Sequence, residues 1–147
     1  MYSNDSWKVR LLQVEALTLG VSEEEVLTVV KWAAPSPLPF APPSVIGVVS
    51  VQGRMFTVLD VGVLLDNEFA VRNAGAIVVL RGDEQLALAV DETRDVVEVK
   101  AEEIKAESAS NLIRGTIPVR GKDVLLLDTD SLFAGVVRGH ERRRRRL

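Results

Sequence analysis

The sequence has 147 residues, of which 47% are hydrophobic and 27% carry a charge, a composition typical of a folded globular chain and not of a disordered one. It contains no cysteine, which excludes a disulfide scaffold and any cysteine-ligated metal site. No apolar run reaches the roughly 18 residues that a membrane-spanning helix needs, and the start lacks the pattern of a signal peptide, so we expect a cytoplasmic protein with no membrane insertion.

Charge is unevenly distributed along the chain, although the net charge is only −3. Arg142 to Arg146 form an unbroken run of five arginines, so the tail is basic and the rest of the chain is acidic. Such a run can bind the phosphates of nucleic acid or of anionic lipid. No aromatic residues are interleaved with it, so the sequence favours a solvated tail, and a nucleic-acid partner is not expected.

Short apolar runs rich in β-branched residues recur along the chain and indicate strands. We interpret the first segment, Lys8–Leu19, as one long strand that ends in a turn at Leu19–Ser22. The other predicted strands are Val26–Val30, Val45–Val51, Met55–Leu59, Ala76–Leu80, Leu86–Val90, Val96–Val99, Leu112–Val119 and Val124–Leu127. Several are apolar at consecutive positions, which predicts that both of their faces are covered.

Glycine-containing turns separate these strands. Gln52-Gly53, Arg81–Glu84 and Arg120–Asp123 each lie between two apolar runs and predict hairpins. Pro35–Pro43 has five prolines in nine residues, so we expect an extended connecting loop. A PxxP-type ligand for another domain is the alternative interpretation of this loop.

Two segments of the sequence are similar to each other and align without a gap. VIGVVSVQGRMFTVLDVGVLL, residues 45–65, is followed 68 positions later by IRGTIPVRGKDVLLLDTDSLF, residues 113–133. The alignment pairs the glycines Gly47 and Gly53 with Gly115 and Gly121. The repeat predicts two structurally equivalent units.

Each repeat unit ends with an aspartate. Asp60 and Asp128 follow an apolar strand and precede the short apolar segments Val61–Leu65 and Thr129–Phe133. A carboxylate that accepts backbone N–H bonds at a helix start explains both aspartates better than catalysis or metal binding. A further turn of helix is predicted at Ala101–Glu107.

The order of the predicted elements suggests two halves. A hairpin near residues 12–30 precedes the unit 45–65, and a second hairpin, 76–90, precedes the unit 112–133. We therefore expect two small β-barrels with a shared core, because closing each sheet removes its exposed edges.

Residues for catalysis are scarce. His140 is the only histidine and lies beside the arginine run, so a histidine-based triad or metal site is not expected. Neither a paired-carboxylate pattern nor a phosphate-binding glycine loop is present. Trp7 and Trp32 are interpreted as packing residues. We expect no enzyme activity, no cofactor, no metal site and no small-molecule substrate.

Three segments in this order and spacing resemble the CheW-like family of chemotaxis coupling proteins. They are LPFAPPSVIGVVSVQGRMFTVLDVGVLL, AIVVLRGDEQLALAVDETRDVVEVKAEEI and LIRGTIPVRGKDVLLLDTDSLF. The resemblance implies an all-β domain over residues 8–136, built from two packed SH3-like five-stranded β-barrel subdomains with short helices. Residues 1–7 and 137–147 would be tails.

The resemblance also implies a function. Proteins of this family are non-enzymatic adaptors that couple the cytoplasmic tip of chemoreceptors to the regulatory domain of a CheA-type histidine kinase. The kinase contact would use apolar residues at a barrel end. A divergent CheW-like interaction module in another signalling pathway, with receptor binding lost, is the alternative.

The receptor-type surface implied by the resemblance contains Val26, Thr28, Gly47 and Gln52. The family usually has a glutamate where this chain has Thr28 and an arginine where it has Gln52. Both positions are neutral here, which is self-consistent because neither charge is left without its partner.

Overall fold

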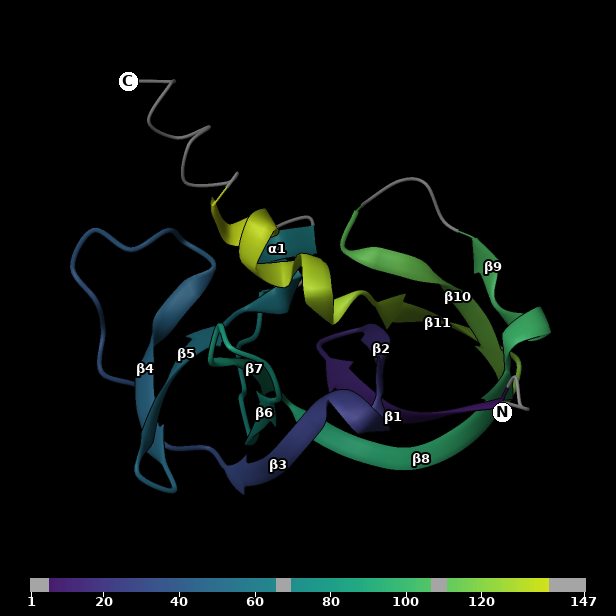
Figure 1. Cartoon of the computed structure of the whole chain (residues 1–147), viewed down its shortest axis with the longest axis horizontal. Helices are drawn as coiled ribbons and strands as arrows, with labels where there is room; N and C mark the ends of the chain where they lie inside the picture. Colours follow the sequence, from purple (N-terminus) through teal and green to yellow (C-terminus); the bar gives the residue numbers. More distant parts are fainter. Residues whose placement is uncertain (1–5, 66–69, 107–110, 138–147) are drawn as a thin grey trace.

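The computed structural model describes residues 6–65, 70–106 and 111–137, and in this part of the chain the strands form two sheets (Figure 1). The six-stranded sheet has the order β8 (Glu92–Lys100), β1 (Ser6–Val14), β2 (Leu17–Ser22), β11 (Lys122–Leu127), β10 (Ile113–Val119) and β9 (Lys105–Ala106). The five-stranded sheet has the order β3 (Val26–Lys31), β6 (Ala76–Leu80), β7 (Leu86–Val90), β5 (Arg54–Leu59) and β4 (Val45–Val51). The expected all-β class is confirmed. The arginine run Arg142–Arg146 lies outside the described residues.

The two sheets have the same internal plan, apart from the short strand β9. In one sheet β7 pairs in parallel with β5, and in the other β2 pairs in parallel with β11. All other strand pairs are antiparallel. The strands β3, β6, β7, β5 and β4 therefore correspond to β8, β1, β2, β11 and β10.

The predicted division of the strands between two halves is wrong. Residues 26–90 supply the whole five-stranded sheet, so the hairpin β6–β7 lies beside the unit 45–65. The N-terminal hairpin β1–β2 lies beside the second unit, with Leu19 opposite Leu125. Periodicity predicts that strands exist, but it carries no information about which strand edges meet.

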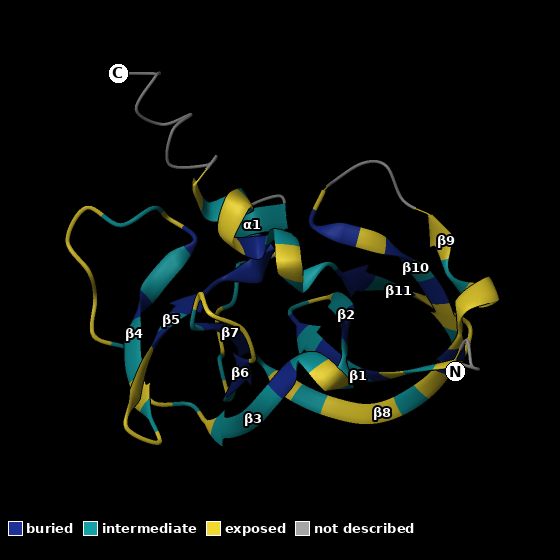
Figure 2. Ribbon diagram, in the orientation of Figure 1, coloured by how far each residue is buried: buried dark blue, intermediate teal, exposed yellow. Residues whose placement is uncertain are grey.

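Three clusters of buried side chains hold the sheets together. Figure 2 marks the buried residues in dark blue along the strands. One cluster is shared between the sheets, and each sheet also has a cluster of its own. On β7, Leu86, Leu88 and Val90 face the shared cluster, whereas Ala87 and Ala89 belong to the cluster of the five-stranded sheet. The alternation explains why all five residues of this strand are buried, as its consecutive apolar positions predicted.

The second strand of each hairpin has small residues on the face that is turned toward its own sheet's cluster. On β2, Leu19 and Val21 face the shared cluster, and Gly20 between them has no space for a side chain. A Cβ at Gly20 would lie 2.6 Å from Cγ1 of Val9. The predicted turn at Leu19–Ser22 is therefore wrong, because this glycine permits close packing inside a strand.

The first segment is two strands rather than the long strand predicted. The chain turns between β1 and β2 at Glu15, whose φ is 52°. The backbone N–H of Glu15 donates to Asp91 (3.0 Å), and the side-chain amide of Gln13 donates to the Glu15 carbonyl (2.7 Å). The turn was not recognised because it lacks glycine and depends on an aspartate far away in the sequence.

Neither sheet closes into a full barrel through paired strands within the described residues. The outer edges are covered or protected locally instead. Ser36 forms an isolated bridge to Val48 on β4, and β9 covers part of β10. The outer strand β8 carries several charged side chains, which disfavour pairing with another chain.

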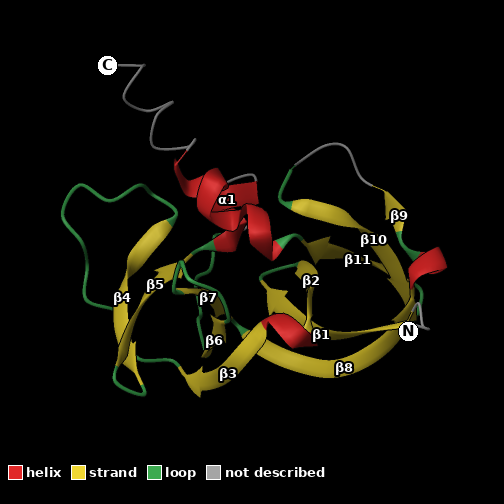
Figure 3. Ribbon diagram, viewed as in Figure 1, coloured by secondary structure: helices red, strands yellow, loops and turns green. Residues whose placement is uncertain are grey.

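Helical segments are short (Figure 3). The predicted helix Val61–Leu65 is confirmed as α1. At the end of the second unit, a 3-10 helix at Thr129–Ser131 continues into helical residues 132–137. The predicted helical turn at Ala101–Glu107 is a 3-10 helix only at Ala101–Glu103, and β9 follows it. The remaining 3-10 helix, η1 (Glu23–Glu25), carries the chain from one sheet to the other.

Because the sheets share a cluster and the chain crosses between them at η1 and again before β8, we predict that they unfold together. Trp7 packs against the cluster of the six-stranded sheet and Trp32 against that of the five-stranded sheet. The variants Trp7→Phe and Trp32→Phe each retain one fluorescent reporter. In each variant, the urea midpoint from tryptophan fluorescence should equal the midpoint from far-UV circular dichroism. Two distinct midpoints within one variant would contradict a single cooperative unit.

Candidate protein-binding surfaces

The four residues assigned to a receptor-type surface lie on the two outer strands of the five-stranded sheet and in the turn after β4. Val26 begins β3 and is 8% exposed, and Gly47 is buried within β4. Thr28 is half-buried on β3, and Gln52 is exposed in the β4–β5 turn. Only Thr28 and Gln52 therefore present side chains to solvent. Within the described residues, no hydrogen bond joins these two side chains.

Gly47 positions the proline-rich loop. The bridge between Ser36 and Val48 consists of two backbone hydrogen bonds of 2.9 and 2.8 Å. This bridge places the Ser36 carbonyl so close to Gly47 that a Cβ on Gly47 would collide with it. Gly115 is equivalent, since its Cβ would lie 2.5 Å from the carbonyl oxygen of Lys105. Both aligned glycines thus allow a crossing segment to lie directly against a strand.

The other aligned glycines form the two hairpin turns. Gln52 and Gly53 have φ values of 54° and 78°, and Arg120 and Gly121 have φ values of 50° and 81°. Two consecutive positive φ values between paired strands are the signature of a type I′ turn. The turns therefore hold Gln52 and Arg120 at equivalent places, one in each sheet.

The two sheets differ in the charge at this equivalent place. Arg120 donates to Asp95 at 2.8 Å, which links the β10–β11 turn to the outer strand β8. Asp95 lies in the irregular part of β8 that corresponds to the irregular part of β3 beside Thr28. The six-stranded sheet therefore has an acid–arginine pair at the places equivalent to Thr28 and Gln52.

Asp60 and Asp128 accept backbone hydrogen bonds at the ends of β5 and β11. The Asp60 carboxylate accepts from the N–H of Val63 (3.2 Å) and of Val71 (3.0 Å). Asp128 accepts from the N–H of Asp130 and the hydroxyl of Ser131, each at 3.2 Å. Asp60 is only 6% exposed, and this burial raises its pKa despite the backbone N–H bonds, which act in the opposite direction.

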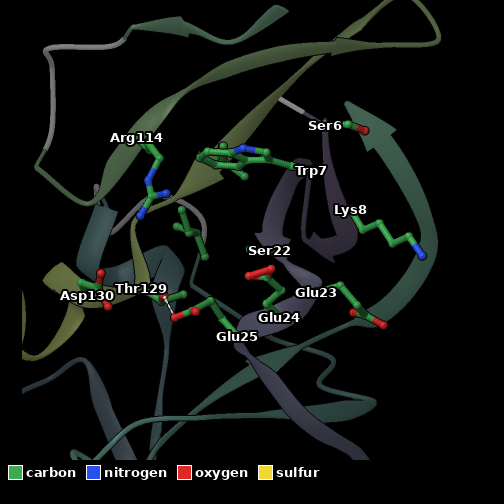
Figure 4. Close-up of a pocket in the computed structure, with 12 residues that line it drawn as sticks. Ser6, Trp7, Lys8, Ser22, Glu23, Glu24, Glu25, Arg114, Thr129 and Asp130 are labelled. Carbon is green, nitrogen blue, oxygen red and sulfur yellow. Dashed lines mark hydrogen bonds between the residues drawn. The ribbon is translucent and has the colours of Figure 1, made fainter. Parts of the chain in front are cut away.

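A cavity of about 680 Å³ lies where η1 passes the ends of β1, β10 and β11 (Figure 4). The Arg114 guanidinium lies 5.2 Å from the ring centroid of Trp7 and 3.4 Å from Asp128. On the other wall the Thr129 hydroxyl donates to Glu25 at 3.0 Å. The hydrogen bond between Thr129 and Glu25 fastens η1 to the second repeat unit.

Beside this cavity Arg10 and Glu23 form a two-point contact. Nε and Nη2 of Arg10 donate to the two carboxylate oxygens of Glu23 at 2.7 and 2.5 Å. The hydrogen bond from Arg10 lowers the pKa of Glu23. The contact fixes η1 to β1 just before the chain leaves the six-stranded sheet.

The described ranges contain no cluster of three or more His, Cys, Asp or Glu side chains suited to a metal ion. They also contain no helix that is long and apolar enough to cross a membrane.

A family model described as the CheW-like domain matches residues 8–137. The chain belongs to the CheW-like domain family. A chemotaxis protein CheW of Rhizobium meliloti (strain 1021) is 23% identical over 110 residues, which are 69% of this chain and 71% of that protein.

The CheW-like fold is also found in the crystal structure of the scaffolding protein TtCheW from Thermoanaerobacter tengcongensis. Its TM-score to this chain is 0.73 at 17% identity, and the match covers 83% of this chain and 88% of that one. The match at this identity concerns the fold, and it confirms the expected CheW-like arrangement of two packed β subdomains.

Sequence reasoning did not find Asp95, the contact between Arg10 and Glu23, or the cavity beside Trp7. Each depends on strands that are distant in sequence. The only sequence signal for Asp95 was Arg120, which occupies the place equivalent to Gln52. An arginine in this turn suggests an acidic partner on a neighbouring strand.

We predict that Gly47→Ala lowers the free energy of unfolding by about 1–3 kcal/mol, because the new Cβ would collide with the Ser36 carbonyl. Urea unfolding measures the loss. Ser50→Ala, at an exposed position of the same strand, is the matched control and should change stability little. Equal stability of Gly47→Ala and the wild type would show that the loop is not fixed at Gly47.

The two shifted carboxylates predict opposite pH dependences. The folded chain binds the proton of Asp60 more tightly than the unfolded chain, because the pKa of Asp60 is raised. Its contribution to stability therefore falls as pH rises from the ordinary value of 3.8 through the raised pKa. The pKa of Glu23 is lowered, so its contribution is present above 4.5 and is lost as pH falls through the lowered pKa.

Urea unfolding of Asp60→Asn and Glu23→Gln, measured against the wild type from about pH 3 to 7, tests both signs. The stability difference, wild type minus variant, should decrease with rising pH for Asp60→Asn and increase for Glu23→Gln. The same slope for both variants would contradict the assignment.

Proposed function

We propose that this chain is a non-enzymatic chemotaxis adaptor that couples chemoreceptors to a CheA-type histidine kinase in the cytoplasm. The observation that carries the proposal is membership of the CheW-like domain family over residues 8–137. The similar chains are named as a chemotaxis protein and a scaffolding protein, which supports the same function. An adaptor needs surfaces for partners and no chemistry, so we expect no cofactor and no small-molecule substrate.

The partners proposed are the regulatory domain of the kinase and the cytoplasmic tip of the receptor. The receptor-type surface is assigned to Thr28 and Gln52, with Val26 and Gly47 shaping the two outer strands beneath it. Thr28 and Gln52 are both neutral, while the charged pair Asp95–Arg120 belongs to the other sheet. The absence of charge at Thr28 and Gln52 favours a second candidate, a divergent CheW-like module that binds a kinase but has lost receptor binding.

Calorimetric titration of the full chain with each purified partner, a kinase regulatory domain and a receptor tip from the same organism, separates the two functions. Binding of both partners supports the coupling adaptor. Kinase binding alone supports the divergent module, and binding of neither contradicts both.

If the receptor-type surface is correct, the paired substitution Thr28→Glu with Gln52→Arg should strengthen receptor-tip binding by roughly tenfold, because it restores complementary charges on that surface. Each single substitution is the matched control and should give no gain, since it adds a charge without a partner. Kinase binding should not change. If the paired variant and the wild type bind the receptor tip with equal affinity, Thr28 and Gln52 do not belong to the receptor-type surface.

A further inference from the structure

Phe40 is the most exposed large hydrophobic residue among those that the structure describes. It is 96% exposed, compared with 43% for Leu38 on the same loop and 53% for Met55. A phenylalanine ring gains much of its stabilising effect from burial, which this position does not supply. Packing within the chain therefore does not account for an aromatic residue here.

The backbone at Phe40 is also unfavourable for its residue type. Its φ is 61°, in the left-handed region that residues with a Cβ rarely adopt. Glycine would occupy this conformation without strain and would expose no ring to water. The positive φ costs the free protein stability and the exposed ring gains it none, so packing within the fold does not explain a phenylalanine here.

The loop that carries Phe40 is held in place at both ends. The bridge between Ser36 and Val48 fixes its start, and the N–H of Val45 donates to the Pro42 carbonyl at 2.9 Å near its end. Between them the N–H of Ala41 donates to the Leu38 carbonyl, at 3.4 Å. Five prolines restrict the remaining backbone. A ring presented on a loop that is already ordered loses little conformational entropy on binding.

The Phe40 loop and the Gln52 turn lie at opposite ends of β4 (Figure 1). The loop enters this strand at Val45, and the turn follows its last residue, Val51. At about 3.3 Å per residue, the strand separates the two features by roughly 20 Å. The part of the loop that carries Phe40 is therefore separate from the Gln52 turn, although Ser36 at the start of the loop lies against Gly47.

The composition of the segment indicates the kind of partner. No charged residue lies between Lys31 and Arg54, so the loop lacks the cations that contacts with anionic lipid or nucleic acid require. A single ring buries about 150–250 Å², far less than the roughly 800 Å² per partner of a stable dimer, so the loop alone does not explain a second copy. A concave apolar pocket on a partner protein fits best, since buried aromatic anchors dominate such contacts.

We propose that Phe40 is the aromatic anchor with which this chain enters an apolar pocket of the kinase regulatory domain. The inference rests on the proposed function, which supplies two partners and assigns the receptor to the solvent-facing side chains of Thr28 and Gln52. Two other exposed large hydrophobic residues, Met55 and Phe133, lie in the β5 strand and the final helical segment.

The test is calorimetric titration of the full-length Phe40→Gly variant with the kinase regulatory domain and, separately, with the receptor tip. Affinity for the kinase domain should fall at least about tenfold, while receptor-tip binding stays at the wild-type level. The Tm should be unchanged or higher, because glycine tolerates the positive φ. Phe40→Trp retains a ring and should restore most of the affinity. Phe133→Ala removes a half-exposed ring elsewhere and should leave kinase binding unchanged.

The outcomes separate this inference from the function on which it rests. If the wild type does not bind the kinase domain, the proposed function fails and the anchor fails with it. If the wild type binds and Phe40→Gly binds within twofold of it, only the anchor is wrong. Loss of receptor-tip binding alone, a Phe40-dependent dimer in sedimentation, or Phe40-dependent binding to phosphatidylserine vesicles would each overturn the choice of partner.

Discussion

The layer of leucine and valine side chains between the two sheets is the constraint on which the rest of this structure depends. Each sheet also curves around a small cluster of its own, so its inner strands are buried on both faces. The strand β7 alternates leucine and alanine for this reason, and β2 carries Gly20 at the corresponding tight position. The hairpin turns, capped helix starts and crossing segments all serve to bring these strands to that layer.

Local features of the fold could be predicted well from the sequence. The repeat located both hairpin turns, the aligned glycines and the aspartates that end each unit, because these depend on residues close together in the chain. The assignment of hairpins to sheets failed, since β6–β7 and β1–β2 present similar apolar patterns and only long-range burial distinguishes their places. The turn at Glu15 was missed because Asp91, rather than a local glycine, stabilises it.

The same distinction applies to the candidate surfaces. A neutral Thr28 and a neutral Gln52 can be read directly from the sequence, but their meaning changes once Asp95 is found paired with Arg120 in the equivalent position of the other sheet. That pair joins β8 to a distant turn, so no local pattern contains it. The exposure and left-handed backbone of Phe40 were equally inaccessible, because a proline-rich segment does not specify which of its side chains remains uncovered.

The parallel contact between β2 and β11 has a consequence for synthesis on the ribosome. The five-stranded sheet comes from the continuous stretch 26–90, so it has all its strands as soon as that stretch emerges. The hairpin β1–β2 must wait, because its neighbour β11 begins only at Lys122. Contacts of such long sequence separation form slowly. The nascent chain thus exposes the Val9 and Leu11 face of this hairpin until β11 has emerged, which is the period when it most needs protection by chaperones.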